Sequence, residues 1–228
     1  MMRNLINQII SKLKREDFKI DSFIPLTYIF SFLFSRLISL LYGCLRLYTF
    51  KRVFVHYSCI IKCSSKLKFG CNLNIADRCY INALSKEGIV MGYNVSLGRL
   101  THIECTGSMS YIGKGIKIGN NVGLGTHGFW GGAGGIEVGN DTIFGNYVSL
   151  HSENHNYADL DIPIRLQGVN RKGIKIGNNC WIGAKVTILD GTVLGNGCIV
   201  AAGAVVRGTF PDNAVIGGVP AKILKMRK

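Results

Sequence analysis

Proline and acidic side chains are scarce in this chain of 228 residues. It has 4 prolines, and its 13 aspartates and glutamates face 27 lysines and arginines, which gives a formal net charge of +14. A charge of this sign favours anionic partners such as nucleic acid, acidic lipid or phosphorylated ligands. The sequence contains no motif that reads nucleic acid, so we expect no nucleic acid partner.

Paired cysteine motifs and a secretion signal are also missing. None of the eight cysteines forms a CxxC pair, which argues against a zinc ribbon or a thioredoxin-like site. The first apolar stretch follows a charged segment of about twenty residues and lacks a small-residue cleavage site, so no cleavable signal peptide is recognised. We therefore expect a cytoplasmic protein with free thiols.

Residues 1–55 carry the main hydrophobic patch. Residues 24–47 read IPLTYIFSFLFSRLISLLYGCLRL, which is helical in composition and nearly long enough to span a bilayer. Arg36 lies in the middle of this stretch, where a charge in lipid is costly. Two interpretations remain open. The segment is a helix that lies in the interface at the inner face of the membrane, or an amphipathic hairpin packed on the main domain or on a neighbouring subunit.

From residue 56 to 208 the sequence is an internal repeat in which apolar residues recur every six positions. Each hexad predicts a short strand and a turn, and three hexads form one coil of a triangular solenoid of about six coils. The apolar positions are Phe69, Ile75, Ile81; Met91, Leu97, Ile103; Ile112, Ile118, Leu124; Val138, Phe144, Leu150; Ile176, Ile182, Ile188; Leu194, Val200 and Val206.

Glycine is abundant, with 29 residues, and often follows the apolar position. Asparagine commonly comes next, and both residues tolerate the left-handed backbone that a corner every six residues needs. Cys79, Cys180 and Cys198 fall four residues after an apolar position, where valine stands in other hexads. We expect these cysteines to be small buried fillers.

The repeat is interrupted at residues 83–89, 105–110, 126–136 and 152–174, and such loops on a rigid scaffold carry function. The first two breaks are short and turn-like, and we assign them no role. The last two contain His127, His151 and His155. From spacing alone, these imidazoles are compatible with a zinc site, a general base or structural histidines.

The stretch from Gly173 to Lys222 resembles the C-terminal half of the hexapeptide-repeat acetyltransferases. Its sequences IGNNCWIGA and GGVPAK are similar to those of the maltose and galactoside acetyltransferases and the polysaccharide-modifying enzymes related to them. The resemblance implies an all-β core, a left-handed parallel β-helix, with an N-terminal helical segment and a short C-terminal helix or tail over residues 209–228. It also implies a homotrimer.

The resemblance further implies which residues carry the chemistry. In this family the catalytic histidine follows the last apolar position before the long loop by five residues, which selects His155 after Leu150. Its imidazole would act as a general base for direct transfer from acetyl-CoA, the donor substrate, without a metal. Residues expected to bind acetyl-CoA are Trp181, Ala184, Ala202, Arg207, Lys222 and Lys225.

The acceptor site departs from the family pattern. Where the sugar-acetylating branch has an Asn and an Asp before the histidine, this chain reads GTHGFWGGAGG. We expect His127, Trp130 and Tyr157 to contact the acceptor instead, because aromatic faces suit a sugar. The leading hypothesis is O-acetylation of a saccharide, free or lipid-linked, in surface polysaccharide biosynthesis, such as that of capsule or O-antigen. The alternatives are N-acetylation of an amino sugar nucleotide and a non-catalytic scaffold.

Overall fold

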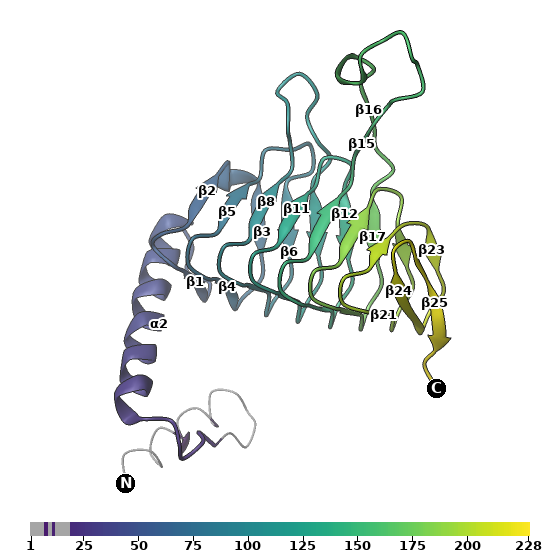
Figure 1. Ribbon diagram of the computed structural model, residues 1–228. Coiled ribbons are helices and arrows are strands. Elements are labelled where there is room, and N and C mark those ends of the chain that lie inside the picture. The colour runs from purple at the N-terminus through teal and green to yellow at the C-terminus, as the bar shows by residue number, and fades with distance from the viewer. Residues whose placement is uncertain (1–6, 9–10, 12–18) are drawn as a thin grey trace.

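The computed structural model describes residues 7, 8, 11 and 19–228. Helix α2 (Leu26–Arg46) leads into a triangular prism of short parallel strands that runs to the C-terminus (Figure 1). Three sheets form the prism walls, and strands that are neighbours in a sheet come from successive coils. The fold is the expected left-handed parallel β-helix.

The three sheets are named A, B and C. Sheet A contains β1 (Val53–Val55), β4 (Leu73–Ile75), β7 (Ser96–Leu97), β10 (Gly123–Leu124), β13 (Ile143–Phe144), β18 (Trp181–Ile182), β21 (Ile199–Val200), β24 (Ala214–Gly218) and β25 (Ala221–Met226). Sheet B contains β2 (Ile60–Lys62), β5 (Tyr80–Asn82), β8 (His102–Glu104), β11 (Phe129–Gly131), β14 (Ser149–His151), β19 (Thr187–Leu189) and β22 (Val205–Val206). Sheet C contains β3 (Leu67–Phe69), β6 (Ile89–Met91), β9 (Ile116–Ile118), β12 (Ile136–Val138), β17 (Ile174–Ile176), β20 (Val193–Leu194) and β23 (Thr209–Phe210).

Left-handed residues and glycines turn the chain at the prism corners. Asn121 and Asn179, between sheets C and A, have φ of 56° and 54°, and His127, between A and B, has φ of 57°. Successive coils also approach closely at the corners, since a Cβ added to Gly125 would lie 2.2 Å from the carbonyl oxygen of Gly145. These contacts explain the frequent Gly and Asn in the hexads.

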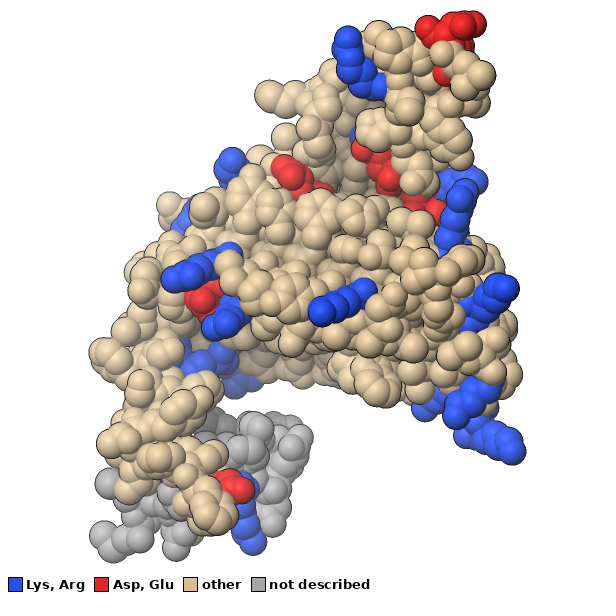
Figure 2. All heavy atoms as spheres, viewed as in Figure 1, with Lys and Arg blue, Asp and Glu red and all other residues tan. Residues whose placement is uncertain are grey.

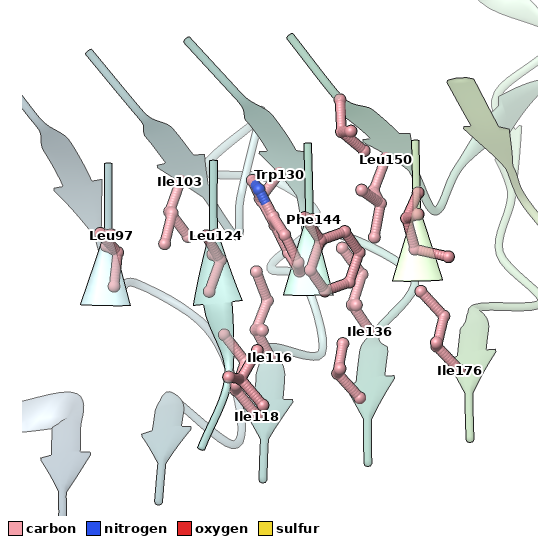
Figure 3. Packing of buried hydrophobic residues seen from close by; sticks show 14 of the residues in the cluster. Leu97, Ile103, Ile116, Ile118, Leu124, Trp130, Ile136, Phe144, Leu150 and Ile176 are labelled. Atoms are coloured by element: carbon pink, nitrogen blue, oxygen red, sulfur yellow. The ribbon is translucent and has the colours of Figure 1, made fainter. Parts of the chain in front are cut away.

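The apolar hexad positions stack inside the prism as continuous columns (Figure 3). One sequence assignment is wrong: Ile112 is 39% exposed, on a loop before β9. Trp130 takes the third position of that coil instead, six residues after Leu124, and is 1% exposed. Residues 126–136 are therefore a regular part of the coil, with β11 in the middle, rather than a break.

Three cysteine predictions are confirmed. Cys79, Cys180 and Cys198 are buried in the same core cluster as the valines that they replace. A cysteine side chain behaves as a small apolar group, so it can take the place of valine in the column.

The prism is longer than expected at both ends. Sheets B and C have seven strands each, so there are seven coils rather than six. β1 begins at Val53, inside the segment predicted to be helical, and β23 and β24 continue sheets C and A beyond residue 208. The expected C-terminal helix is absent over the described residues 209–228, where β24 and β25 form an antiparallel hairpin.

Helix α2 packs on the first coil mainly through its C-terminal half. A Cβ added to Gly43 would lie 2.7 Å from the carbonyl oxygen of Val53, so glycine permits close packing on β1. The Arg36 guanidinium stacks over the ring of Phe54 at 3.5 Å and donates a hydrogen bond to Asn74 Oδ1. Arg46 donates to the carbonyl oxygen of Ile61 at 2.8 Å. The Arg36 charge, which would be costly in the middle of a membrane-spanning helix, is thus held by contacts with the prism.

A ladder of amides joins the coils at the corner between sheets C and A. Asn178 Oδ1 accepts the backbone N–H of Asn140 at 2.8 Å, and Asn178 Nδ2 donates to Asn196 Oδ1 at 2.9 Å. Asn196 N in turn donates to Asp212 Oδ1 at 2.8 Å. One side chain therefore links three successive coils.

Replacing Asn178 with alanine should lower the free energy of unfolding by about 1–2 kcal/mol, because both links are lost while the backbone N–H of Asn140 is left without its acceptor. Asn178→Asp, which keeps the acceptor oxygen for Asn140, should lose less. Urea denaturation followed by circular dichroism measures both. Equal unfolding free energies for Asn178→Ala and the unaltered chain would contradict a stabilising role of the ladder.

Candidate active site

His155 lies on a two-stranded ribbon that projects from the corner between sheets B and C. The ribbon consists of β15 (Asn154–His155) and β16 (Val169–Asn170), which pair antiparallel with His155 opposite Val169. We call residues 152–173 the long arm; it includes the 3₁₀ turn η2 (Ile164–Leu166). The His155 side chain is exposed, and its ring makes no hydrogen bond to any described residue. An imidazole held by its backbone but free at its nitrogens suits proton transfer.

Two anchors fix the base of the long arm. Ser152 is 1% exposed, accepts a hydrogen bond from Gly134 N at 2.9 Å and donates to the carbonyl oxygen of Gly131 at 2.6 Å. At the other end Asp190, 3% exposed, accepts the backbone N–H groups of Lys172 and Gly173, the latter at 2.7 Å. The arm leaves and re-enters the prism at defined points.

A second projection, the short arm (residues 105–115), rises from the same edge of the prism (Figures 1 and 2). Arg171 of the long arm connects the two. Its Nε donates to Glu153 Oε2 at 2.5 Å, its Nη2 donates to the carbonyl oxygen of Tyr111 at 3.1 Å, and its guanidinium stacks over the Tyr111 ring at 3.9 Å. Glu153, which could have oriented an imidazole, therefore pairs with Arg171 instead.

His155 lines hollows on both sides of the ribbon. On the side of the C-terminal coils is a cavity of about 470 Å³, lined also by Tyr157, Lys172, Asp190 and Arg207. On the side of the N-terminal coils is a cleft of about 760 Å³ between the two arms. Tyr157 and Arg207 therefore lie near His155.

His151 is close to this site but has a different environment. It lies at the end of β14, and its ring stacks on Phe129 of the preceding coil with centroids 5.3 Å apart. Burial lowers the pKa of the His151 imidazole, which favours the neutral form. His102 stacks on the other side of Phe129, so His151 is part of a ring stack along sheet B.

The structure corrects one predicted acceptor residue, Trp130, and places a second, His127, away from His155 of the same chain. Trp130 points into the core, where its ring packs against Phe144 with centroids 4.8 Å apart, and it has no surface to offer a sugar. His127 lies at the corner between sheets A and B, on the other edge of sheet B from His155, and stacks on Tyr147. Within the described residues of one chain, no three side chains of the types that bind metals are grouped, so a single chain offers no zinc site.

The other predicted donor residues lie together but away from His155. Ala184 and Ala202 are neighbours at the corner between sheets A and B, where Gly203 N donates to the carbonyl oxygen of Ala184 at 2.9 Å. Trp181, 54% exposed, precedes them on sheet A, and Lys222 and Lys225 lie on β25 of the same sheet. Among the described residues, no cavity that contains His155 also contains any of these five.

Sequence reasoning missed the short arm and the groups that fix the long arm. The break at 105–110 received no role because it looks like a turn, and Arg171 lies far from it in sequence. Asp190 offered a usable signal, since it is a carboxylate at a corner where other coils have small neutral residues. Its hydrogen bonds to the end of the long arm could not be inferred from spacing.

Comparison with known proteins places these features in a family. The model of the bacterial transferase hexapeptide family (six repeats) matches residues 173–208. A protein of Escherichia coli strain K12, WbbJ, named for lipopolysaccharide biosynthesis O-acetyl transfer, is 28% identical over 178 residues, which cover 75% of this chain and 77% of that protein. A Mycobacterium tuberculosis protein named as an acetyltransferase is 32% identical over 134 residues, which cover 59% of this chain and 45% of its own length.

A solved structure shares the fold. The N-acyltransferase AntD from Bacillus cereus, in complex with dTDP and coenzyme A, superposes with a TM-score of 0.58 at 22% identity, over 71% of this chain and 84% of that chain. The parallel β-helix, the repeat match and the acetyltransferase relatives agree with one another. Residues 173–208 therefore carry the hexapeptide repeat of the bacterial transferases, and the chain as a whole is similar to acetyltransferases.

Proposed function

We propose that the protein transfers an acetyl group from acetyl-CoA to a saccharide hydroxyl, with His155 as the general base. The observation that carries this proposal is the exposed imidazole between two hollows, since direct transfer needs donor and acceptor to reach one base together. The anchors at Ser152 and Asp190 hold that imidazole in place before either substrate binds.

In the proposed reaction one imidazole nitrogen of His155 takes the proton from the acceptor hydroxyl as its oxygen attacks the thioester carbonyl. A new C–O ester bond forms, the C–S bond breaks, and the proton returns from the imidazole to the departing thiolate. General base catalysis of this kind contributes roughly 10²–10⁴-fold to the rate. His151 remains beside the site as a neutral, stacked ring and is given no proton to carry.

The donor residues fit a long, phosphorylated ligand at the C-terminal coils. Small side chains at Ala184 and Ala202 leave the backbone of the corner open, and Lys222 and Lys225 supply positive charge farther along the same sheet. Phosphates bind such cations through charge-assisted hydrogen bonds. Because these residues and His155 lie at different edges of sheet B, the site needs two copies of the chain, and a homotrimer supplies them.

O-acetylation is preferred over N-acetylation because the O-acetyl transferase relative aligns with most of both chains. On this basis we place the reaction in the biosynthesis of a surface polysaccharide, in the cytoplasm at the inner face of the membrane. The likeness to the N-acyltransferase is a likeness of fold.

Thiol release from acetyl-CoA in the presence of a panel of hydroxy- and amino-sugars tests the proposal. Release that depends on a hydroxy-sugar supports O-transfer, and release with amino-sugars alone overturns it in favour of N-transfer. If no sugar supports release, titration with coenzyme A decides. Binding then indicates a missing acceptor, and its absence favours a scaffold without catalytic activity.

We further infer that helix α2 holds the protein on an anionic membrane surface. The helix has 21 residues and a mean hydropathy of 1.6 over its most apolar window, of which 11% is buried, so length and composition alone would allow a span. Seven-residue spacing puts Ile29, Arg36 and Gly43 on the side that faces the first coil.

The remaining faces of α2 distinguish an interfacial helix from a spanning one. One exposed side is apolar and contains Phe30, Leu33, Phe34, Leu37, Leu41 and Leu45. Another is a polar stripe of Ser31, Ser35 and Ser39, four residues apart. Residues 22–35 contain no charged side chain, and Figure 2 shows none along the visible face of the helix. An apolar face beside a polar stripe, on a chain with net charge +14, suits the surface of an acidic bilayer.

Flotation of the full chain with vesicles of phosphatidylglycerol and phosphatidylcholine tests this contact. Serine at Phe30, Phe34 and Leu41 together should weaken binding at least tenfold, because three large apolar side chains no longer enter the bilayer. Alanine at Ser31, Ser35 and Ser39 is the matched control and should keep the binding. If the unaltered chain stays in solution, and the serine variant changes its oligomeric state instead, α2 packs on another subunit.

A further inference from the structure

The two walls of the cleft between the short and long arms are joined to each other by Arg171. Arg171 bonds to Glu153 within the long arm and to the carbonyl oxygens of Tyr111 and Ile112 in the short arm. Its side chain is 13% exposed, so this connection is largely shielded from water. The two walls of the cleft therefore have a fixed separation.

The walls of this cleft are rich in groups that hydrogen-bond hydroxyls. Its volume of about 760 Å³ is within the range of small-molecule sites and exceeds that of the cavity on the other side of the ribbon. The short arm contributes Ser108, Ser110 and Tyr111, and the long arm contributes His155 and Arg165. Tyr111 is 52% exposed and presents both a ring and a hydroxyl. Such a wall suits a saccharide.

The charge at the cleft is positive. Glu153 and Arg171 neutralise each other at 2.5 Å. Arg165, on η2, is exposed and makes no hydrogen bond or ion pair with another described residue. The exposed Asp159 of the same arm does not line the cleft; it lines an adjoining hollow that shares His155, Asn156 and Gln167 with it. The one unmatched full charge on the described walls of the cleft is therefore a guanidinium, which pairs with carboxylate or phosphate.

The opposite side of the ribbon, which faces the C-terminal coils, is the side on which we expect the donor. The cavity there lies on the C-terminal coils, with Arg207 and Lys172 in its wall, and Trp181, Ala184 and Ala202 belong to the same coils. In the proposed homotrimer, a donor held by these residues of a neighbouring copy reaches His155 from the side of the C-terminal coils. The cleft on the N-terminal side is then left for the acceptor, within reach of the same imidazole.

We propose that the cleft between residues 105–115 and 152–173 is the acceptor site, and that Arg165 makes it selective for a saccharide that carries an acidic group. This inference rests on the proposed acyl transfer. According to this inference, the short arm helps to determine which acceptor binds. His155 lies in the wall of the cleft, next to the hydroxyl that reacts.

Two sugars that differ only at C6 test the inference: 4-nitrophenyl β-D-glucuronide and 4-nitrophenyl β-D-glucoside. We expect the full chain to bind the glucuronide at least fivefold more tightly in a calorimetric titration, because only this sugar pairs with Arg165. Arg165→Gln should remove that preference. Lys175→Gln, which removes an exposed cation from β17 of sheet C outside both hollows, is the matched control and should keep it. Glucose 6-phosphate against glucose, as a second pair, shows whether phosphate replaces carboxylate.

Equal binding of both members of each pair, no binding of any, or a preference that persists in Arg165→Gln would each overturn the inference. Coenzyme A is titrated into the same samples. If coenzyme A binds and the acidic sugars show no preference, the acceptor assignment fails alone. If coenzyme A does not bind, the proposed transfer itself fails, whatever the sugars do.

Discussion

Replacing His155 with alanine should lower the rate of acetyl transfer by roughly 10²–10⁴-fold, which is the usual contribution of a general base. The side chain is exposed and makes no hydrogen bond within the described chain. Its removal should therefore leave the free energy of unfolding unchanged. The backbone pairing with Val169 remains, because it does not depend on the side chain. Stability and coenzyme A binding should therefore stay unchanged while turnover falls.

His56→Ala is the matched control for this experiment. It removes an imidazole of the same chemistry from the first coil, where the ring packs against Tyr57 and Nδ1 shares a hydrogen bond with Ser58 Oγ. Turnover in this variant should remain close to that of the unaltered chain. The measurement is thiol release from acetyl-CoA with the best acceptor of the sugar panel. Near-normal turnover in His155→Ala, or an equal loss in both variants, would contradict a general base at position 155.

The sequence predicted the prism because the physical requirement for a coil is repeated in every coil. A strand that buries one apolar residue and turns at Gly or Asn gives the same signal many times, and the columns in the core confirm it. One residue, Ile112, was assigned to the core because spacing alone cannot separate an apolar loop residue from a buried one. The correct choice was visible in retrospect: Trp130 follows Leu124 by six positions and needs no interruption.

The candidate site was less accessible from sequence. His155 could be selected through a resemblance to known enzymes, and the structure brings Tyr157 and Arg207 to its side. The link between the arms could not be predicted, since the Arg171 guanidinium donates to the backbone carbonyl oxygens of Tyr111 and Ile112. Every residue has such an oxygen, and the Tyr111 ring that the guanidinium stacks on lies 60 positions away in the sequence. The prediction for Trp130 was wrong for a different reason. A tryptophan ring can stack on a sugar, but it can also fill a large position in the core, and the residue type alone does not distinguish the two.

The burial of Trp130 predicts a large contribution of this side chain to stability. Replacing Trp130 with alanine should lower the free energy of unfolding by about 3–5 kcal/mol, the usual cost of emptying a buried aromatic position. The ring is 1% exposed and packs edge-on against Phe144 of the neighbouring sheet (Figure 3). The prism cannot collapse around the vacancy, because each coil is hydrogen-bonded to the coils on both sides at β11.

The second tryptophan provides the control, since the chain has only two. Trp181 is 54% exposed on sheet A, and Trp181→Ala should change the unfolding free energy by about 0.5 kcal/mol or less. Urea denaturation at one protein concentration, followed by circular dichroism, measures both variants without dependence on tryptophan emission. Iodide should quench the fluorescence of Trp130→Ala, which retains the exposed ring, far more than that of Trp181→Ala. Similar unfolding free energies for the two variants, or similar quenching, would mean that Trp130 faces solvent. Trp130 would then again be a candidate for contact with the acceptor.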